Sequence, residues 1–267
     1  MLKDITLGQY YPVSSVLHRL DPRVKLAGTL IFMVSLFIVN SFGYILCTVF
    51  LVSMIAISHV PFSYMARGLK TIFFLLAFTA ALNLFLTSGE TVWQFGFLRI
   101  THEGIRTAVT MAVRLVYLVL GASLMTLTTT PNKLTDGLEK AFAPLNKIRV
   151  PVHDIAMMMS IALRFIPILT EETDKIMKAQ MARGADFESG KLMQRVKALI
   201  PLLVPMFVSA FRRANDLAVA MEARCYKGGE GRTHMKPLEY TSGDYAGYII
   251  LIAYLCAIII LRVVFGW

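Results

Sequence analysis

Charged residues are scarce in this chain of 267 residues: they make up 16% of it, whereas soluble domains carry about a quarter. Hydrophobic residues make up 56%, the mean hydropathy is +0.62, and the apolar residues are grouped in blocks. This pattern is typical of an integral membrane protein. No small-residue cleavage site follows the first apolar block, so we expect no cleavable signal peptide.

Cysteine is scarce as well, with three residues that lie far apart in the sequence. They form neither a C-x-x-C pair nor a zinc-binding spacing, so we expect no disulfide framework and no metal site. Cys47, Cys225 and Cys256 are each expected to act as a small apolar filler. The five histidines are scattered in or near connectors, which favours solvated side chains over metal ligands.

Motifs that carry out catalysis are absent from the sequence. The nearest match to a phosphate-binding loop, 184–192, has five residues between its glycines instead of four, and Leu192 stands where a hydroxyl must hold magnesium. Asp136 and Gly137 begin a pattern found in membrane phosphotransferases, but the Ala-Arg that should follow is missing. There is no H-E-x-x-H and no G-x-S-x-G turn. We therefore expect that the chain is not an enzyme and holds no cofactor.

Five apolar segments have the composition of membrane-spanning helices. Asp21 and Pro22 precede the first one, and this pair is typical of a helix start in which aspartate is the N-cap. The expected fold is an all-α integral membrane protein with about five transmembrane helices and long cytoplasmic helices. Its three regions are an N-terminal membrane region, a cytoplasmic or interfacial helical region and a C-terminal transmembrane helix: 1–129, 130–242 and 243–267. The expected spans are 26–42, 44–58, 71–87, 107–127 and 245–264.

Positive charge is distributed unevenly, and this asymmetry predicts the orientation. Seventeen of the 27 lysines and arginines lie in 130–242, and four lie in 1–25. Cytoplasmic loops carry an excess of these residues, so we expect a multi-pass protein of the cell membrane with its N-terminus and 130–242 in the cytoplasm. The net charge of +10 indicates contact with the anionic headgroups of the lipid bilayer. No aromatic-and-basic module predicts binding to nucleic acid.

Two further apolar runs, 155–169 and 198–211, are short and interrupted by proline. If both crossed the membrane, 170–197 with its six lysines and arginines would lie outside, against the charge asymmetry. We expect instead two long helices near the inner face, bent by the prolines where apolar sequence gives way to polar sequence. A shorter amphipathic helix with Pro131 at its first position is expected to precede them.

Two short triplets, Ala182-Arg183-Gly184 and Ala223-Arg224-Cys225, each end one of the long helical patterns. Small neighbours let a helix end fit into a groove, where the planar guanidinium can bind a carboxylate through two hydrogen bonds. A solvated arginine that the helix dipole favours at a C-terminus is the alternative interpretation.

Together, 17–26, 181–184 and 220–226 resemble the transmembrane (T) component of energy-coupling factor ABC transporters, and the resemblance covers nearly the whole chain. It implies that the long helices are coupling helices and that the triplets bind two cytosolic ABC ATPases, one arginine on each. ATP and magnesium are then expected in those ATPases and not in this chain. A small membrane protein, the substrate-capture (S) subunit, is expected to bind the vitamin or other micronutrient. The second triplet has Cys225 where the family commonly has glycine.

Other interpretations stay open at this point. Within the family, the chain could belong to a transporter dedicated to cobalt or nickel. A membrane-embedded lipid-modifying enzyme would need carboxylates at the inner interface, where the sequence has one acidic cluster of Glu171, Glu172 and Asp174. A channel or secondary carrier would usually have carboxylates at membrane depth, and the five expected spans contain none. Arg114 lies well inside an expected span, where we expect it to snorkel or to have one structural partner.

Overall fold

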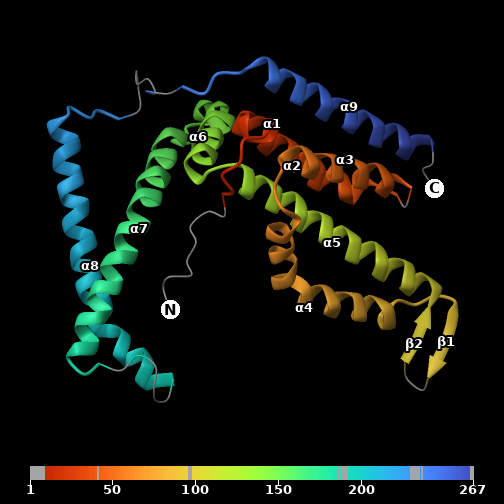
Figure 1. The fold of residues 1–267 in the computed structure, drawn as a ribbon, viewed down its shortest axis with the longest axis horizontal. Coiled ribbons are helices and arrows are strands. Elements are labelled where there is room, and N and C mark those ends of the chain that lie inside the picture. The colour runs from red at the N-terminus through yellow and green to blue at the C-terminus, as the bar shows by residue number, and fades with distance from the viewer. Residues whose placement is uncertain are drawn as a thin grey trace. The chain divides into compact units, whose positions relative to one another are not determined.

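The computed structural model describes residues 10–40, 42–95, 98–185, 187, 192–228, 235 and 237–264. In these ranges the chain is almost entirely helical, which confirms the predicted all-α class (Figure 1). One antiparallel hairpin, where no strand was predicted, precedes α5. The elements in chain order are α1 (Val16–Arg19), α2 (Pro22–Ile38), α3 (Gly43–Ser58), α4 (Phe62–Leu86), β1 (Thr91–Phe95), β2 (Leu98–Thr101), α5 (His102–Thr128), α6 (Pro131–Phe142), η2 (Ala143–Ile148), α7 (Val152–Ala182), α8 (Leu192–Ala223) and α9 (Ser242–Val264).

The chain divides into two compact units. The bundle unit comprises residues 8–137 and 238–267, and it contains α1 to α5, the start of α6, and α9. The helix-pair unit comprises 138–237 together with 1–7, and its main elements are α7 and α8.

Local sequence signals account for several helix boundaries. The carboxylate of Asp21 accepts a hydrogen bond from the backbone N–H of Arg23 and caps α2, with Pro22 in the first turn, as predicted. Pro131 begins α6, also as predicted. The start of α4 differs, because the helix begins at Phe62, nine residues before the expected span. The first part of α4 is polar on one side, so it lacks the continuous apolar character of a span, and Pro61 before it is compatible with a helix start.

The number of membrane spans stays a prediction. Among the described residues, three helices are long and apolar enough to cross a membrane, namely α5, α7 and α9, and the bent helix α4 is a fourth if it counts as one span. The helices α2 and α3 overlap expected spans but have 17 and 16 residues. At 1.5 Å per residue they rise about 25 Å, short of a hydrocarbon core of about 30 Å. The sequence had indicated that α7 lies at the inner face, yet its length and hydropathy also suit a span.

The core of the bundle unit joins α2, α3 and α9 through Tyr254. Its ring stacks on Phe50 with the ring centroids 4.2 Å apart. Its hydroxyl lies 2.9 Å from the Ser35 hydroxyl and 3.3 Å from the Cys47 sulfur, all of them buried. Every described polar atom of this cluster therefore has a partner inside an apolar environment, which such burial requires.

The predictions for the three cysteines hold in part, and the prediction of a structural partner for Arg114 is confirmed. All three cysteines are free, but only Cys47 is a buried filler; Cys225 and Cys256 are exposed, so the filler interpretation is wrong for them. Cys225 lies beyond the C-terminal end of α8, and Cys256 lies on α9 with its side chain exposed. Arg114 has a structural partner, since its Nε donates to the Tyr44 hydroxyl at 3.1 Å.

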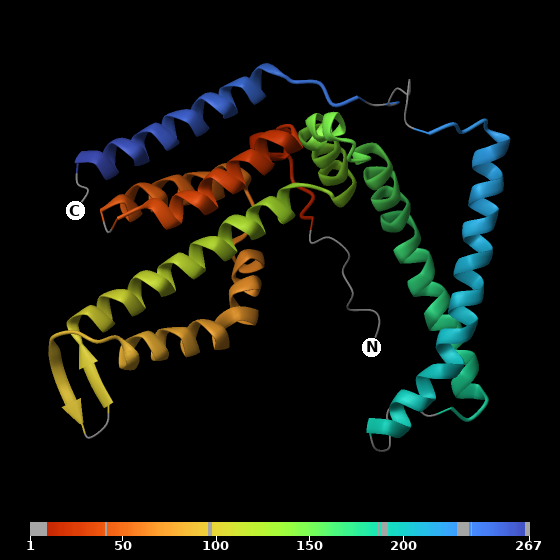
Figure 2. The same ribbon diagram turned by 180° about the vertical axis from the view of Figure 1, so that it is seen from behind.

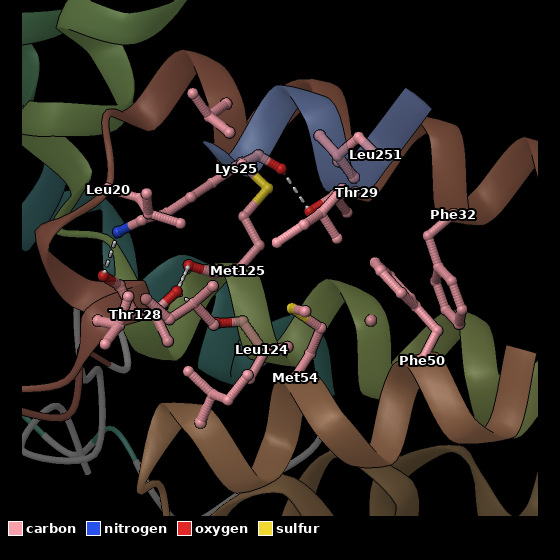
Figure 3. Close-up of a pocket in the computed structure, with 18 of the residues that line it drawn as sticks. Leu20, Lys25, Thr29, Phe32, Phe50, Met54, Leu124, Met125, Thr128 and Leu251 are labelled. Carbon is pink, nitrogen blue, oxygen red and sulfur yellow. Dashed lines mark hydrogen bonds between the residues drawn. The ribbon is translucent and has the colours of Figure 1, made fainter. Parts of the chain in front are cut away.

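A cavity of about 250 Å³ lies inside the bundle unit among α2, α3, α5 and α9 (Figure 3). Its wall is almost wholly apolar, and Lys25 is the one ionisable residue among those that line it in the described part of the chain. The Lys25 ammonium donates to the backbone carbonyls of Thr128 at 3.0 Å and His18 at 3.4 Å. The cavity thus offers no pair of acid and base groups for catalysis.

Candidate partner-binding site

The first candidate arginine lies at the C-terminal end of α7. Arg183 is the C-cap, and the next residue, Gly184, has a φ of +89°. The Gly184 N–H donates to the Met181 carbonyl and the Ala185 N–H donates to the Gln180 carbonyl, each at 2.9 Å. These two bonds define a Schellman motif, in which a left-handed residue turns the chain away from the helix.

The second candidate arginine lies at the end of α8 in the same geometry. Arg224 follows the last helical residue, and the Cys225 N–H donates to the Glu222 carbonyl at 2.8 Å. The Tyr226 N–H donates to the Met221 carbonyl at 3.0 Å, which completes the second Schellman motif. Cys225 has a φ of +57°, so a residue with a side chain adopts the conformation that glycine adopts in the first triplet.

These geometries predict opposite effects of substitution at the two caps. Gly184→Ala adds a side chain to a left-handed residue and is expected to destabilise that helix end by about 1 kcal/mol. Cys225→Gly relieves the same strain but adds freedom to the unfolded chain, so a gain of about 0.5 kcal/mol is expected. Amide hydrogen exchange measured by mass spectrometry should show Ala185 exchanging faster in the first variant and Tyr226 exchanging more slowly in the second. The unaltered cap is the internal control, and equal changes at both caps would contradict this account.

Both guanidinium groups are available for a partner. Arg183 and Arg224 are exposed, as are their neighbours in both triplets. Within the described residues neither arginine has an ion pair or a hydrogen-bond partner for its side chain. The ends of α7 and α8 confirm the prediction that each arginine ends a long helix. The exposure of each side chain suits insertion into a groove.

Helices α7 and α8 pack against each other in opposite directions (Figures 1 and 2). Glu172 accepts hydrogen bonds from Ser209 and from Arg213, whose Nη2 lies 2.9 Å from the carboxylate. Toward the end of α7, the Gln180 amide donates to the Pro201 carbonyl at 3.4 Å. Residues of increasing number on α7 therefore contact residues of decreasing number on α8, so the two helices are antiparallel.

The antiparallel arrangement places the two arginines at opposite ends of the pair. Arg183 lies eleven residues beyond Glu172, and Arg224 lies fifteen residues beyond Ser209. At a rise of 1.5 Å per residue, about 40 Å of helix separates them. Such a distance prevents the two guanidinium groups from binding one small ligand together, whereas two separate protein surfaces can each receive one of them.

The acidic cluster of Glu171, Glu172 and Asp174 on α7 does not form a metal site in the described part of the chain. No group of three or more histidine, cysteine, aspartate or glutamate side chains there could hold a metal ion. Glu172 is already engaged by Arg213, which removes one carboxylate from the cluster that a lipid-modifying enzyme would need.

The sequence interpretation missed a polar cluster at the start of α9. The carboxylate of Asp244 is 1% exposed and accepts hydrogen bonds from Thr241, at 2.8 Å from its N–H, and from the backbone N–H of Asp21 at 2.6 Å. A recognisable signal was present, since threonine followed three residues later by an acidic residue is a capping box. It predicts the contact with Thr241, but nothing local predicts the contact with Asp21.

Comparison with known proteins identifies the family to which the chain belongs. The cobalt transport protein family, CbiQ, matches residues 13–235. Three relatives carry the curated name "Energy-coupling factor transporter transmembrane protein EcfT". The relative from Clostridium kluyveri is 54% identical over 269 residues, covering 100% of both chains. The relatives from Ruminiclostridium cellulolyticum and Bacillus subtilis are 51% and 47% identical, covering 99% and 98% of this chain and 100% of their own. The chain therefore belongs to the family of transmembrane (T) components of energy-coupling factor transporters.

Proposed function

We propose that this chain is the membrane scaffold through which two cytosolic ABC ATPases drive a small substrate-capture subunit in the uptake of a vitamin or other micronutrient. One observation carries the proposal: two exposed arginines occupy matching helix ends at opposite ends of an antiparallel pair. The names of the relatives support it, because they describe transmembrane proteins of energy-coupling factor transporters.

The mechanism begins in the partner ATPases, which bind ATP and magnesium. When ATP closes the two ATPases, their grooves move and carry Arg183 and Arg224 with them. The helices α7 and α8 then shift beneath the substrate-capture subunit, which reorients and releases its substrate. Exposed methionines on α7, among them Met158 and Met159, suit a contact that must repack during this movement.

This function requires the triplets to face the cytoplasm. The excess of lysine and arginine supports a cytoplasmic N-terminus and a cytoplasmic location of 130–242. Cys225 lies beside Arg224 and is exposed, so the accessibility of its thiol can report on which side of the membrane the second triplet lies.

Cobalt or nickel uptake is the second candidate. The description of the matching family as cobalt transport proteins favours it, because dedicated metal transporters would share this chain's architecture. Both candidates predict the same contacts with the ATPases and differ in the captured substrate.

Purification of the intact native complex, followed by mass spectrometry, tests the proposed function. The tagged chain is expected to co-purify with two ABC ATPase subunits and a small membrane protein. Substrate bound to that small protein identifies vitamin or metal uptake. The chain purified alone is expected neither to hydrolyse ATP nor to move substrate across liposomes. Recovery without any ATPase, or transport by the chain alone, would show that the proposal is wrong.

A further inference from the structure

Two connections between the units lie against one corner of the bundle unit. Within the described residues, the chain leaves the bundle unit after Gly137 and returns to it at Leu238; a third crossing, between residues 7 and 8, lies outside them. The corner consists of Asp21, Pro22 and Arg23, which form the N-terminal end of α2. We refer to it as the 21–23 corner.

The outgoing connection packs directly on Pro22. Gly137 is buried on α6, and a Cβ atom placed on it would lie 2.7 Å from the Pro22 Cβ. That separation is far below van der Waals contact, so only glycine allows the backbone of α6 to approach the corner so closely. The first residues of the helix that leads to α7 are thereby held against the start of α2.

The returning connection is held by Arg23. Its guanidinium donates to the Leu238 carbonyl at 3.4 Å and lies 3.8 Å from the centre of the Tyr240 ring. The Asp21 carboxylate accepts from Arg23 Nη2 at 2.9 Å and from its Nε at 3.0 Å, which orients the guanidinium over the ring. A cation over a tyrosine face is attracted by the ring's quadrupole.

A second attachment is made by Asp244, four residues after Tyr240 in the returning chain. The buried carboxylate of Asp244 accepts from the Asp21 N–H at 2.6 Å, and from the Thr241 N–H and hydroxyl at 2.8 and 2.7 Å. This carboxylate therefore bonds the start of α9 to the backbone of the corner. The segment that returns from α8 meets the bundle unit at the N-terminal ends of α2 and α9 together.

We propose that the 21–23 corner is the joint through which movement of α7 and α8 enters the bundle unit, with Arg23 and Tyr240 as positioning residues. The inference rests on the proposed function and adds the route that the movement takes. Displacement that reaches Gly137 or Leu238 passes to the two helices that begin at the corner, because both residues are held against it. Both described connections converge on three consecutive residues. Loosening the contact of either connection with the corner should therefore weaken the transmission of movement from α7 and α8 to the bundle unit.

Tyr240→Leu tests the joint in the complete complex of this chain, its ATPases and its capture subunit, reconstituted in liposomes. The Tyr240 side chain is 40% exposed, so the variant is expected to fold and assemble. Substrate uptake per ATP hydrolysed is expected to fall at least about fivefold, the lower end of typical coupling between two sites. Tyr240→Phe is the matched control, because it keeps the ring under Arg23; its ratio is expected to stay within about twofold of the wild type.

Gly137→Val tests the other connection by forcing a side chain against Pro22, and the same loss of uptake per ATP is expected. If both this variant and Tyr240→Leu keep that ratio within about twofold, in a complex that assembles and transports, the joint is disproved while the proposed function stands. A parallel fall of uptake and hydrolysis, with their ratio unchanged, also disproves it. If the wild-type chain recruits no ATPase, the joint and the proposed function fail together.

Discussion

Replacing both Arg183 and Arg224 with glutamate is expected to abolish co-purification of the ATPases and to reduce substrate uptake to background. Each arginine is exposed at a helix end, where its guanidinium can enter a groove and bind a carboxylate with two hydrogen bonds. Glutamate reverses the charge and places like charges in contact. Pull-down from detergent and uptake into liposomes measure the two effects.

The expected loss of binding free energy follows from the values that are typical of arginines at the centres of protein interfaces. Truncation of such a residue typically costs about 2–4 kcal/mol, which weakens binding by about 30-fold to 1,000-fold. Two losses at separate places leave no anchored ATPase. Because about 40 Å of helix separates the two arginines, each single variant is expected to lose one contact and keep the other.

Arg212→Glu is the matched control for these variants. Arg212 is exposed on α8 and undergoes the same change of charge, but it lies in the body of the helix and not at its end. Its variant is expected to retain both ATPases. If it loses them as the double variant does, general attraction between opposite charges explains the binding. If the double variant retains both ATPases in normal proportion, the triplets are not the binding site.

Replacing Asp244 with asparagine is expected to lower the free energy of unfolding of the purified protein by about 3 kcal/mol. The carboxylate is 1% exposed and receives three hydrogen bonds, all from donors in Asp21 and Thr241. An amide accepts through its oxygen but turns an NH₂ group toward the remaining donors, which then lose their acceptor. Thermal unfolding in detergent should show a melting temperature lower by about 6–12 °C.

Asp154→Asn provides the comparison for the Asp244 variant. Asp154 also lies in the first turn of a long helix, but it is exposed to solvent. Its substitution is expected to change stability by no more than about 0.5 kcal/mol. Equal melting temperatures of the two variants would contradict a structural role for the buried carboxylate.

Helix ends could be predicted from the sequence because their signals are local. Asp21 and Pro22 at the start of α2, Pro131 at the start of α6 and Gly184 after α7 act on backbone groups within a few residues. The helix end at Arg224 could be predicted even though Cys225 is a poor candidate for a left-handed residue. The apolar run before it and its similarity to the first triplet compensated for the missing glycine.

Contacts between distant segments were not predictable in the same way. Asp21 and Asp244 are 223 residues apart in sequence, and their hydrogen bond depends on how α2 and α9 pack. The early start of α4 escaped detection for a related reason. Its first turns are polar on one side, and a search for apolar blocks interprets such a segment as a connector.

The two arginine-bearing helix ends are alike in geometry but lie at different distances from the hydrogen bonds that join α7 and α8. The side-chain contacts described between α7 and α8 extend from Gln180 with Pro201 to Glu172 with Arg213. Arg183 lies three residues beyond these hydrogen-bonded contacts and Arg224 lies eleven residues beyond them, which corresponds to about 5 Å and about 16 Å of helix. A rotation of the pair about these contacts therefore moves the Arg224 end farther. If the two ATPases bind these ends as proposed, an equal pull on the two arginines exerts the larger torque on the helix pair through the Arg224 end.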